Sequence, residues 1–168
     1  VALASNTTVH GFGWKVTYSN MPTGQGPGYY GIWADNATKV KIFGLEVDGD
    51  KTSYDPCDAW GIYFRQCDDV EVVHCYIHDV FRIGIGAGQV ATGQTTNAKF
   101  HHNHIETVGD AREGSQYGNG IAILHARYVL IESNTISGIY GTASINLEGD
   151  TYSDITIRGN HVKAGTGS

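Results

Sequence analysis

Apolar and polar residues alternate in short runs along almost the whole chain, with the period of two that is typical of β-strands. Six ten-residue segments align without gaps: TTVHGFGWKV (7–16), VKIFGLEVDG (40–49), VEVVHCYIHD (70–79), AKFHHNHIET (98–107), VLIESNTISG (129–138) and ITIRGNHVKA (155–164). A shorter alternating segment precedes each of the last five: GIWA (31–34), GIYF (61–64), IGIG (83–86), GIAIL (120–124) and SINLE (144–148). No stretch shows convincing helical periodicity, so the pattern predicts an all-β chain built from a repeated unit.

The third and eighth residues of every ten-residue segment are apolar. The third positions are Val9, Ile42, Val72, Phe100, Ile131 and Ile157, and the eighth are Trp14, Val47, Ile77, Ile105, Ile136 and Val162. Short strands repeated at this spacing predict a parallel β-helix, in which each coil buries its apolar face by stacking on its neighbours at ~4.8 Å. We therefore expect a single domain over residues 1–168 with about six coils.

Asparagine occupies the sixth position of the last three segments, as Asn103, Asn134 and Asn160. An inward asparagine at a bend can bond to the next asparagine and to the backbone of the bend. These residues therefore predict a structural ladder rather than a site of chemistry.

The phrase nVxIxxNxI, preceded by GI, resembles the right-handed parallel β-helix repeat of the pectate-lyase-like superfamily. The stretches SNTTVHGFG (5–13) and VKIFGLEVDGD (40–50) are similar to early coils of those proteins, and the resemblance covers nearly the whole chain. The superfamily includes pectate and alginate lyases, polygalacturonases, mannuronan epimerases and bacteriophage tailspikes. The resemblance implies a polysaccharide partner.

The catalytic signatures of two of these enzymes are missing. WGIYFRQ (60–66) stands where the epimerase YGxDPHE motif would fall and lacks its Asp and His, and YDPCD (54–58) matches only superficially. The polygalacturonase set is also absent, because the pair Asp68–Asp69 occupies a turn position. No catalytic residue is therefore carried over from the resemblance.

Strand parity gives a candidate site instead. If the third, sixth and eighth positions point inward, the seventh and ninth point outward. On the second to fourth coils these outward positions bring together six side chains: Glu46, Asp48, Tyr76, His78, His104 and Glu106. Side chains on neighbouring coils lie within ~5 Å, close enough for a carboxylate to raise the pKa of a histidine or orient its ring.

Loop lengths predict a groove near His78. Long loops (16–30, 48–60 and 107–119) leave the same corner of the coil, and a short connection beside His78 lies between two of them. Such a notch on a solenoid suits a polysaccharide. Loop aromatics could stack on sugar rings or pack against the solenoid, and both readings stay open; they are Tyr29, Tyr30, Tyr54, Trp60 and Tyr117.

The candidate residues suggest two reaction types. In a lyase or epimerase, Tyr76, His78 or His104 would take the C5 proton, and Arg82 would neutralise the carboxylate of an anionic sugar. A glycoside hydrolase would need two carboxylates, for which Asp48, Asp79 and Glu106 are candidates. We expect Tyr76, His78, Arg82, His104 and Glu106 to be catalytic, and we expect Asp48, Trp60, Tyr54 and Tyr117 to bind substrate.

Metal chemistry has weaker support. We expect no zinc site, because His101 and His102 should point in different directions and no closed four-ligand set appears with His74 and His104. Calcium could bind Asp48, Asp50, Asp55 and Asp58, although an acidic solvated loop is the simpler explanation of these residues.

Cysteine leaves two readings open. Cys57, Cys67 and Cys75 match no zinc spacing, so we expect buried thiols, with a Cys57–Cys67 disulfide as the alternative in a secreted protein. Two N-x-T sequons, at Asn6 and Asn36, matter only in a glycosylating host.

Charge and hydropathy exclude some partners. The net charge of −6 and the lack of a basic stripe argue against nucleic acid, and no apolar run is long enough to span a membrane. No cap helix covers either end, so we expect a piece of a longer solenoid, a homo-oligomer or an end-to-end assembly. We expect an extracellular, cell-surface or virion location, and the alternative to polysaccharide binding is a structural β-helix in a phage tail, filament or adhesin.

Overall fold

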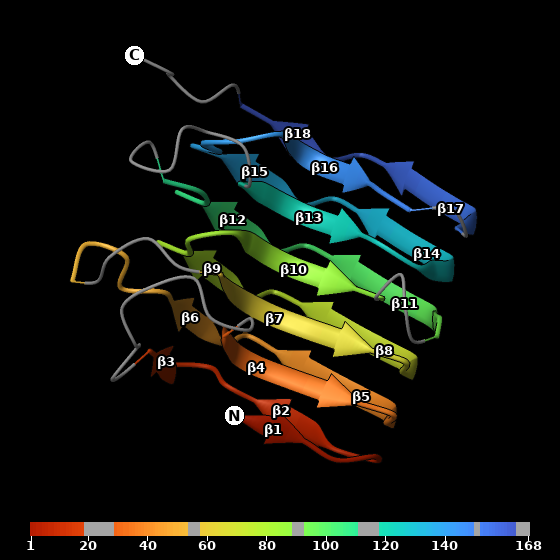
Figure 1. The fold of residues 1–168 in the computed structure, drawn as a ribbon. Coiled ribbons are helices and arrows are strands. Elements are labelled where there is room, and N and C mark those ends of the chain that lie inside the picture. Colours follow the sequence, from red (N-terminus) through yellow and green to blue (C-terminus); the bar gives the residue numbers. More distant parts are fainter. Residues whose placement is uncertain (19–28, 54–57, 89–92, 111–117, 150–151, 164–168) are drawn as a thin grey trace.

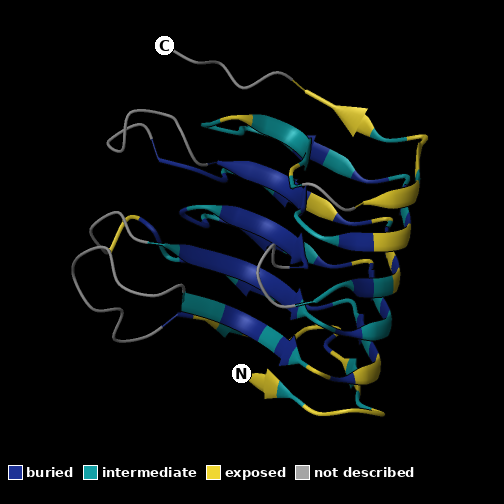
Figure 2. Ribbon diagram, turned by 45° about the vertical axis from the view of Figure 1, so that its right-hand side comes forward, coloured by how far each residue is buried: buried dark blue, intermediate teal, exposed yellow. Residues whose placement is uncertain are grey.

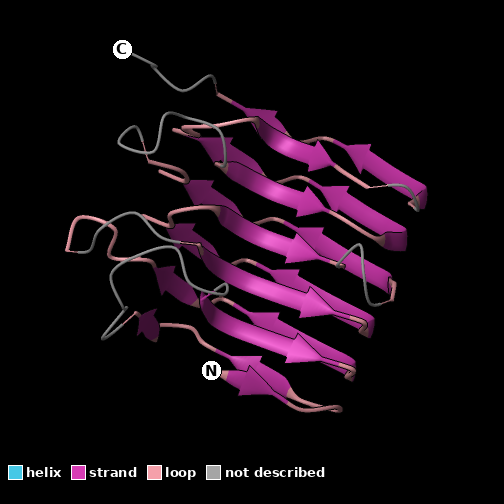
Figure 3. Ribbon diagram, viewed as in Figure 1, coloured by secondary structure: helices cyan, strands magenta, loops and turns pink. Residues whose placement is uncertain are grey.

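The computed structural model describes residues 1–18, 29–53, 58–88, 93–110, 118–149 and 152–163. Throughout these ranges the regular structure consists of strands that wind upward as a solenoid (Figures 1 and 3). No helix in the described part of the chain is long and apolar enough to cross a membrane.

The strands form three parallel sheets of six strands each. Sheet A contains β1 (Ala2–Leu3), β4 (Tyr29–Asp35), β7 (Ala59–Arg65), β10 (Ile83–Ala87), β13 (Asn119–Ile123) and β16 (Ala143–Leu147). Sheet B contains β2 (Thr8–His10), β5 (Thr38–Phe43), β8 (Asp68–Val73), β11 (Thr95–His101), β14 (Ala126–Glu132) and β17 (Ser153–Arg158). Sheet C contains β3 (Lys15–Thr17), β6 (Glu46–Asp48), β9 (Tyr76–His78), β12 (His104–Glu106), β15 (Thr135–Ser137) and β18 (His161–Val162).

One strand from each sheet makes one rung, and each strand pairs only with its counterparts on the rungs above and below. The predicted β-helix is therefore confirmed. Each ten-residue segment is two strands joined by a bend, since Ile42 lies in sheet B and Val47 in sheet C. The shorter GI segments supply sheet A.

Apolar residues from all three sheets meet in one continuous core, which fills the middle rungs (Figure 2). The third and eighth positions are fully buried on the second to fifth rungs. On the last rung, Ile157 and Val162 are 44% and 48% exposed. Burial is therefore greatest where a rung has neighbours on both sides, as expected for a stacked repeat.

The asparagine ladder is confirmed at the bend between sheets B and C. Asn103 Nδ2 donates to Val72 O and to Asn134 Oδ1, both at 3.0 Å. Asn134 repeats the pattern with Phe100 O and Asn160 Oδ1, both at 2.9 Å. The ladder satisfies buried polar groups and fixes the bend on successive rungs.

The residue just before each bend position has a left-handed backbone. In this column φ is 61° at Gly44, 55° at His74, 55° at His102 and 54° at Ser133. A second column lies near the start of the sheet B strands and includes Asp69, at φ 53°. Asp68, which begins β8, accepts hydrogen bonds from Thr96 and Asn97 on the next rung, so the pair lies at the start of a strand rather than in the predicted turn.

The gap-free alignment is wrong in the first coil. Lys15 pairs with Glu46 and Val16 with Val47, so the chain is shifted by two residues relative to the repeat. Val16, rather than Trp14, takes the inward position, and Trp14 is 73% exposed. The extra residues bulge at the bend, where the ring of Phe12 lies over Gly44.

The disulfide alternative is also wrong. Cys67 and Cys75 are buried free thiols, and Cys67 Sγ lies 3.2 Å from Arg65 O and 3.4 Å from Ala34 O. Burial raises the pKa of both thiols, to about 11 for Cys75. Cys57 lies outside the described residues. The expectation of buried thiols holds for the two cysteines that the structure describes.

Candidate functional site

The outer face of sheet C brings most of the predicted site residues together. In one column Asp48 pairs with His78 and His78 with Glu106; in the other, Tyr76 lies between Glu46 and His104. The strands are short, and the tight bend that precedes each one sets the same register on every rung. The predicted juxtaposition of His78 and Glu106 is therefore present.

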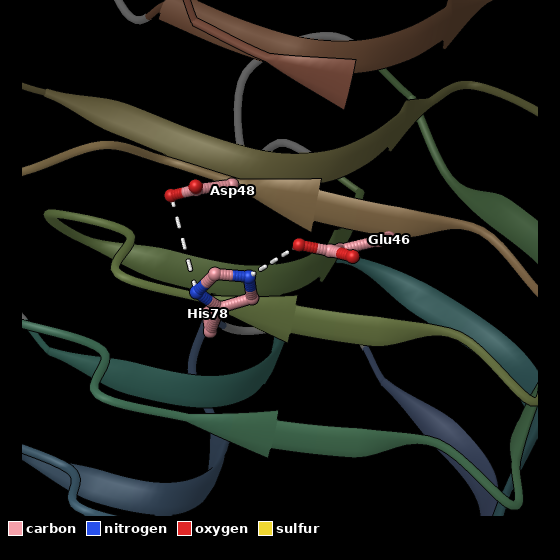
Figure 4. Close-up of side chains that lie close together, drawn as sticks. All are labelled: Glu46, Asp48 and His78. Atoms are coloured by element: carbon pink, nitrogen blue, oxygen red, sulfur yellow. Dashed lines mark hydrogen bonds and ion pairs between the residues drawn. The ribbon is translucent and has the colours of Figure 1, made fainter. Parts of the chain in front are cut away.

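His78 is the centre of an ion network (Figure 4). Its Nε2 lies 3.2 Å from Glu46 Oε1, its Nδ1 lies 2.8 Å from Asp79 Oδ2, and Asp48 Oδ1 is 3.9 Å away. Burial opposes a positive charge here, but the hydrogen bonds to Asp79 and Glu46 and the charge of Asp48 outweigh it, so the pKa of His78 is raised. Because both ring nitrogens face carboxylates, the site favours the imidazolium form.

Lys15 completes this network from the rung below. Its Nζ lies 2.5 Å from Asp48 Oδ2 and 3.3 Å from Glu46 Oε1. The hydrogen bond from His78, together with Lys15, lowers the pKa of Glu46. For Asp48, burial is outweighed by the hydrogen bonds from Lys15 and the Asp50 N–H, which leave the pKa of Asp48 below its usual range.

Glu46, Asp48 and His78 offer one ligand atom each, all within 4.8 Å of one another. A metal ion there would have to displace the Lys15 ammonium, and it would need a deprotonated His78 nitrogen that the carboxylates disfavour. The cluster therefore fits an ion-pair network better than a metal centre.

Tyr76 belongs to a second group on the same face. Its hydroxyl donates to Glu106 Oε1, while Glu106 Oε2 lies 3.3 Å from His104 Nε2. The Tyr76 ring stacks on His78 at a centroid distance of 4.3 Å and lies 5.1 Å from the His104 ring. Burial and the bond to Glu106 raise the pKa of Tyr76, so its phenol stays protonated and makes a poor base.

The groove predicted near His78 is closed at that residue, which is only 9% exposed. Lys51 lies across the short connection that follows His78. Its N–H donates to Asp79 O, and its Nζ lies 2.8 Å from Thr107 O and 2.7 Å from Gly109 O, which belong to the next rung. Lys51 is itself 8% exposed. Of the sheet C candidates, His104 is the most accessible, with half of its side chain exposed.

Trp60 and Arg82 lie in a different place. Trp60 is on the outer side of sheet A, where it packs with Tyr63 and Ile83 and is 9% exposed. Asp58 links it to Arg82: Trp60 Nε1 donates to Asp58 Oδ1 at 2.7 Å, and Arg82 Nη1 donates to the same oxygen at 2.7 Å. Arg82 is therefore paired with the Asp58 carboxylate beside sheet A rather than with His78 on sheet C.

The aromatic cluster around Trp60 is larger than the sequence predicted. Tyr30 stacks on Tyr63 at 4.8 Å, and the Trp33 ring lies 6.1 Å from the Tyr30 ring. Trp60 meets Tyr63 edge-on at 4.4 Å. Tyr30 and Trp33 are partly exposed, so the cluster presents two aromatic rings to solvent over a buried base.

Asn119 adds an unusual polar atom beside this cluster. The register Trp60↔Ile83↔Asn119 places it in the same column of sheet A. Its Oδ1 is buried and accepts no hydrogen bond from the described residues. A buried acceptor needs a donor, which the described residues do not provide.

Sequence reasoning missed Trp33, Tyr63 and Asn119. The signal was available in GIWA and GIYF, because parity along these strands places Trp33 and Tyr63 opposite to the inward Ile32 and Ile62. The site predicted from the sequence rests on outward positions of the ten-residue segments, whereas Trp33 and Tyr63 lie in the shorter GI segments.

Some of the other predicted residues lie outside the described part of the chain, and the remaining calcium candidates have partners within the protein. Tyr54, Tyr117 and Asp55 lie outside the described residues. The other calcium candidates all have protein donors: Asp48 accepts from Asp50 N, Asp50 from Ser53, and Asp58 from Trp60 and Arg82. The structure thus gives the described carboxylates partners other than calcium.

The comparisons with known proteins identify the fold family. The family model described as a right handed beta helix region matches residues 30–168, which is most of the chain. No curated protein and no solved structure matches the sequence. The matched region runs from β4 to the end of the chain, through the same three-sheet repeat, and the chain therefore belongs to the right-handed β-helix family.

Proposed function

We propose that this β-helix binds a neutral extracellular polysaccharide across the outer face of sheet A. The observation that carries the proposal is the pair of partly exposed rings, Tyr30 and Trp33, standing over the buried Trp60 and Tyr63. Sugars present apolar C–H faces that pack on aromatic rings, and Tyr and Trp offer large contact areas at low entropic cost.

Polar groups around the rings suit sugar hydroxyls. The Asp58–Arg82 pair lies at the start of the same strands. The Asp35–Arg65 pair lies at the other end of β4 and β7. Because each arginine is paired with a carboxylate, this surface carries no excess positive charge, which favours a neutral polymer over an anionic one.

A repeating solenoid also suits a repeating polymer. Equivalent positions recur on every rung at ~4.8 Å, so a long chain can lie along the stack and make several weak contacts at once. With such a partner, we propose that the protein acts outside a cell, at a cell surface or on a virion.

Retention on immobilised polysaccharides tests the proposal. The wild-type protein should bind a neutral polysaccharide, and the binding should survive about 0.5 M salt because stacking is not screened. Trp33→Ala should abolish retention, whereas Tyr128→Ala, which removes a 57% exposed ring from sheet B, should not. Retention by anionic polymers alone, lost in salt, would contradict the proposal.

A rigid structural rod is the second candidate, and the sheet C network favours it. Lys15, His78 and Glu106 each link to residues on neighbouring rungs, so the network reinforces the stack. A rod with no glycan partner would fail the retention experiment with every neutral and anionic polysaccharide, while keeping its fold.

Catalysis on sheet C stays a prediction. A lyase would produce unsaturated products that absorb ultraviolet light, and a hydrolase would release reducing ends. Either activity should vanish in His78→Ala or in a variant of the exposed pair, His104→Ala, with the circular dichroism spectrum unchanged. Turnover that survives both substitutions would exclude sheet C as the catalytic surface.

A further inference from the structure

A histidine pair on the bend between sheets B and C is independent of both surfaces described above. His101 ends β11, and His102 follows at the left-handed position. Strand alternation leads one to expect consecutive side chains to diverge, but the left-handed bend turns them together. Their Nδ1 atoms lie 3.0 Å apart, which overturns the expectation that the two rings point in different directions.

Glu71 fixes the state of the first ring. His101 Nε2 lies 2.8 Å from Glu71 Oε1, and an ionised carboxylate can only accept. The proton of neutral His101 therefore sits on Nε2, and Nδ1 presents its lone pair to His102. A carboxylate behind the far nitrogen is the arrangement that orients histidine ligands in metal sites.

The distance between the two Nδ1 atoms suits the binding of both to one metal ion. With metal–nitrogen bonds of ~2.0–2.1 Å, two nitrogens 3.0 Å apart subtend an angle of roughly 90–100° at the ion. This angle matches neighbouring positions in the tetragonal geometry of Cu²⁺ or Ni²⁺ better than the wider tetrahedral angle of Zn²⁺. Cu²⁺ also has the highest intrinsic affinity for such ligands.

A third imidazole stands one rung away. His74 occupies the same bend position as His102, and their ring centroids are 5.3 Å apart. The same column contains Gly44 and Gly159, the residue type that adopts this backbone at least cost. Histidine occupies this position on two adjacent rungs, and the His74 and His102 side chains are both exposed.

We infer that His101 and His102 form a bidentate surface site for a divalent transition metal, preferentially Cu²⁺, through their facing Nδ1 atoms. Small rotations of the two rings direct both lone pairs at one ion. His74 provides a neighbouring imidazole, and water completes the coordination. The ion replaces the hydrogen bond that joins the two rings in the metal-free protein.

Calorimetric titration of untagged full-length protein with Cu²⁺ tests the inference. The wild type should bind one ion at this site, and electron paramagnetic resonance should show at least two equatorial nitrogens. His101→Gln and His102→Asn should each weaken binding roughly tenfold or more, because each removes one ligand. Asparagine tolerates the left-handed backbone, and His101→Gln decides the matter alone if the other variant misfolds.

Two histidine controls locate the ion. His161→Asn, on β18, should leave the Cu²⁺ affinity unchanged, and so should His78→Asn on sheet C. Equal affinity in the wild type and the His101→Gln/His102→Asn double variant would overturn the inference. Loss of binding in His78→Asn alone would also overturn it, because the ion would then occupy the carboxylate cluster of Glu46 and Asp48.

Discussion

The outer faces of sheets A and C belong to the same rungs but differ in what their side chains contact. On sheet A, rings stack on rings, and two of them remain partly exposed above a buried base. On sheet C, carboxylates, imidazoles and one ammonium are bonded to each other across rungs. The first face keeps contact area available for a partner, whereas the second uses its polar groups within the protein.

This difference separates two features that are easily confused in a sequence. A cluster of histidines and carboxylates resembles an active site, yet His78 is buried and both of its nitrogens are committed. On sheet A, in contrast, the Tyr30 and Trp33 rings stay partly exposed above Trp60 and Tyr63. Accessible contact area, rather than residue type, distinguishes a surface that can bind from one that supports the fold.

The largest expected effect is on sheet A. Trp60→Ala should lower the free energy of unfolding by about 3–5 kcal/mol, because it removes a large, well-packed side chain and leaves a cavity. Urea denaturation measures the change. The matched control is Trp14→Ala: that ring is 73% exposed, so its loss should change stability far less. Equal effects of the two substitutions would mean that the aromatic cluster is not a packed base.

The next largest effect is on sheet C. His78→Asn should lower the free energy of unfolding by about 1–3 kcal/mol, because Glu46 and Asp79 lose a charged hydrogen-bond partner in a partly buried setting. The loss should be smaller than for Trp60→Ala, since exposed charges recover hydration. An unchanged denaturation midpoint would show that the network contributes nothing to the stack.

The smallest effect is the pH dependence that the His78 network on sheet C should give near neutral pH. The raised pKa of His78 gives stability that is complete below about pH 6.5 and is lost as pH rises through the folded-state value. The lowered pKa of Glu46 gives stability that is present above about pH 4.3 and is lost as pH falls through its folded-state value. The network should therefore be strongest between about pH 4.3 and 6.5.

Unfolding free energies measured across pH test this window. The difference between the wild type and His78→Asn should shrink as pH rises above neutrality, and Trp33→Ala on sheet A should show no such trend. A constant difference across pH would indicate that His78 acts through packing alone.

The sequence was sufficient for the repeat, the asparagine ladder and the columns of sheet C, because strand period and stacking follow directly from residue spacing. It failed in the first coil, where the two-residue shift at Val16 leaves no mark on the alternating pattern. It also failed for Lys51, which crosses from one rung to carbonyls on another, and for the facing rings of His101 and His102. These contacts depend on side-chain reach and on a left-handed bend, which periodicity does not encode.

Glycan affinity in two matched variants tests the central claim, that sheet A binds and sheet C supports. For a neutral polysaccharide that the wild type retains, Trp33→Ala should raise the Kd roughly tenfold or more, because it removes an exposed aromatic anchor. Glu106→Gln on sheet C should leave the Kd within about twofold, since that residue bonds to Tyr76 and His104 rather than to a partner. The reverse outcome, with affinity lost in Glu106→Gln and kept in Trp33→Ala, would contradict the account.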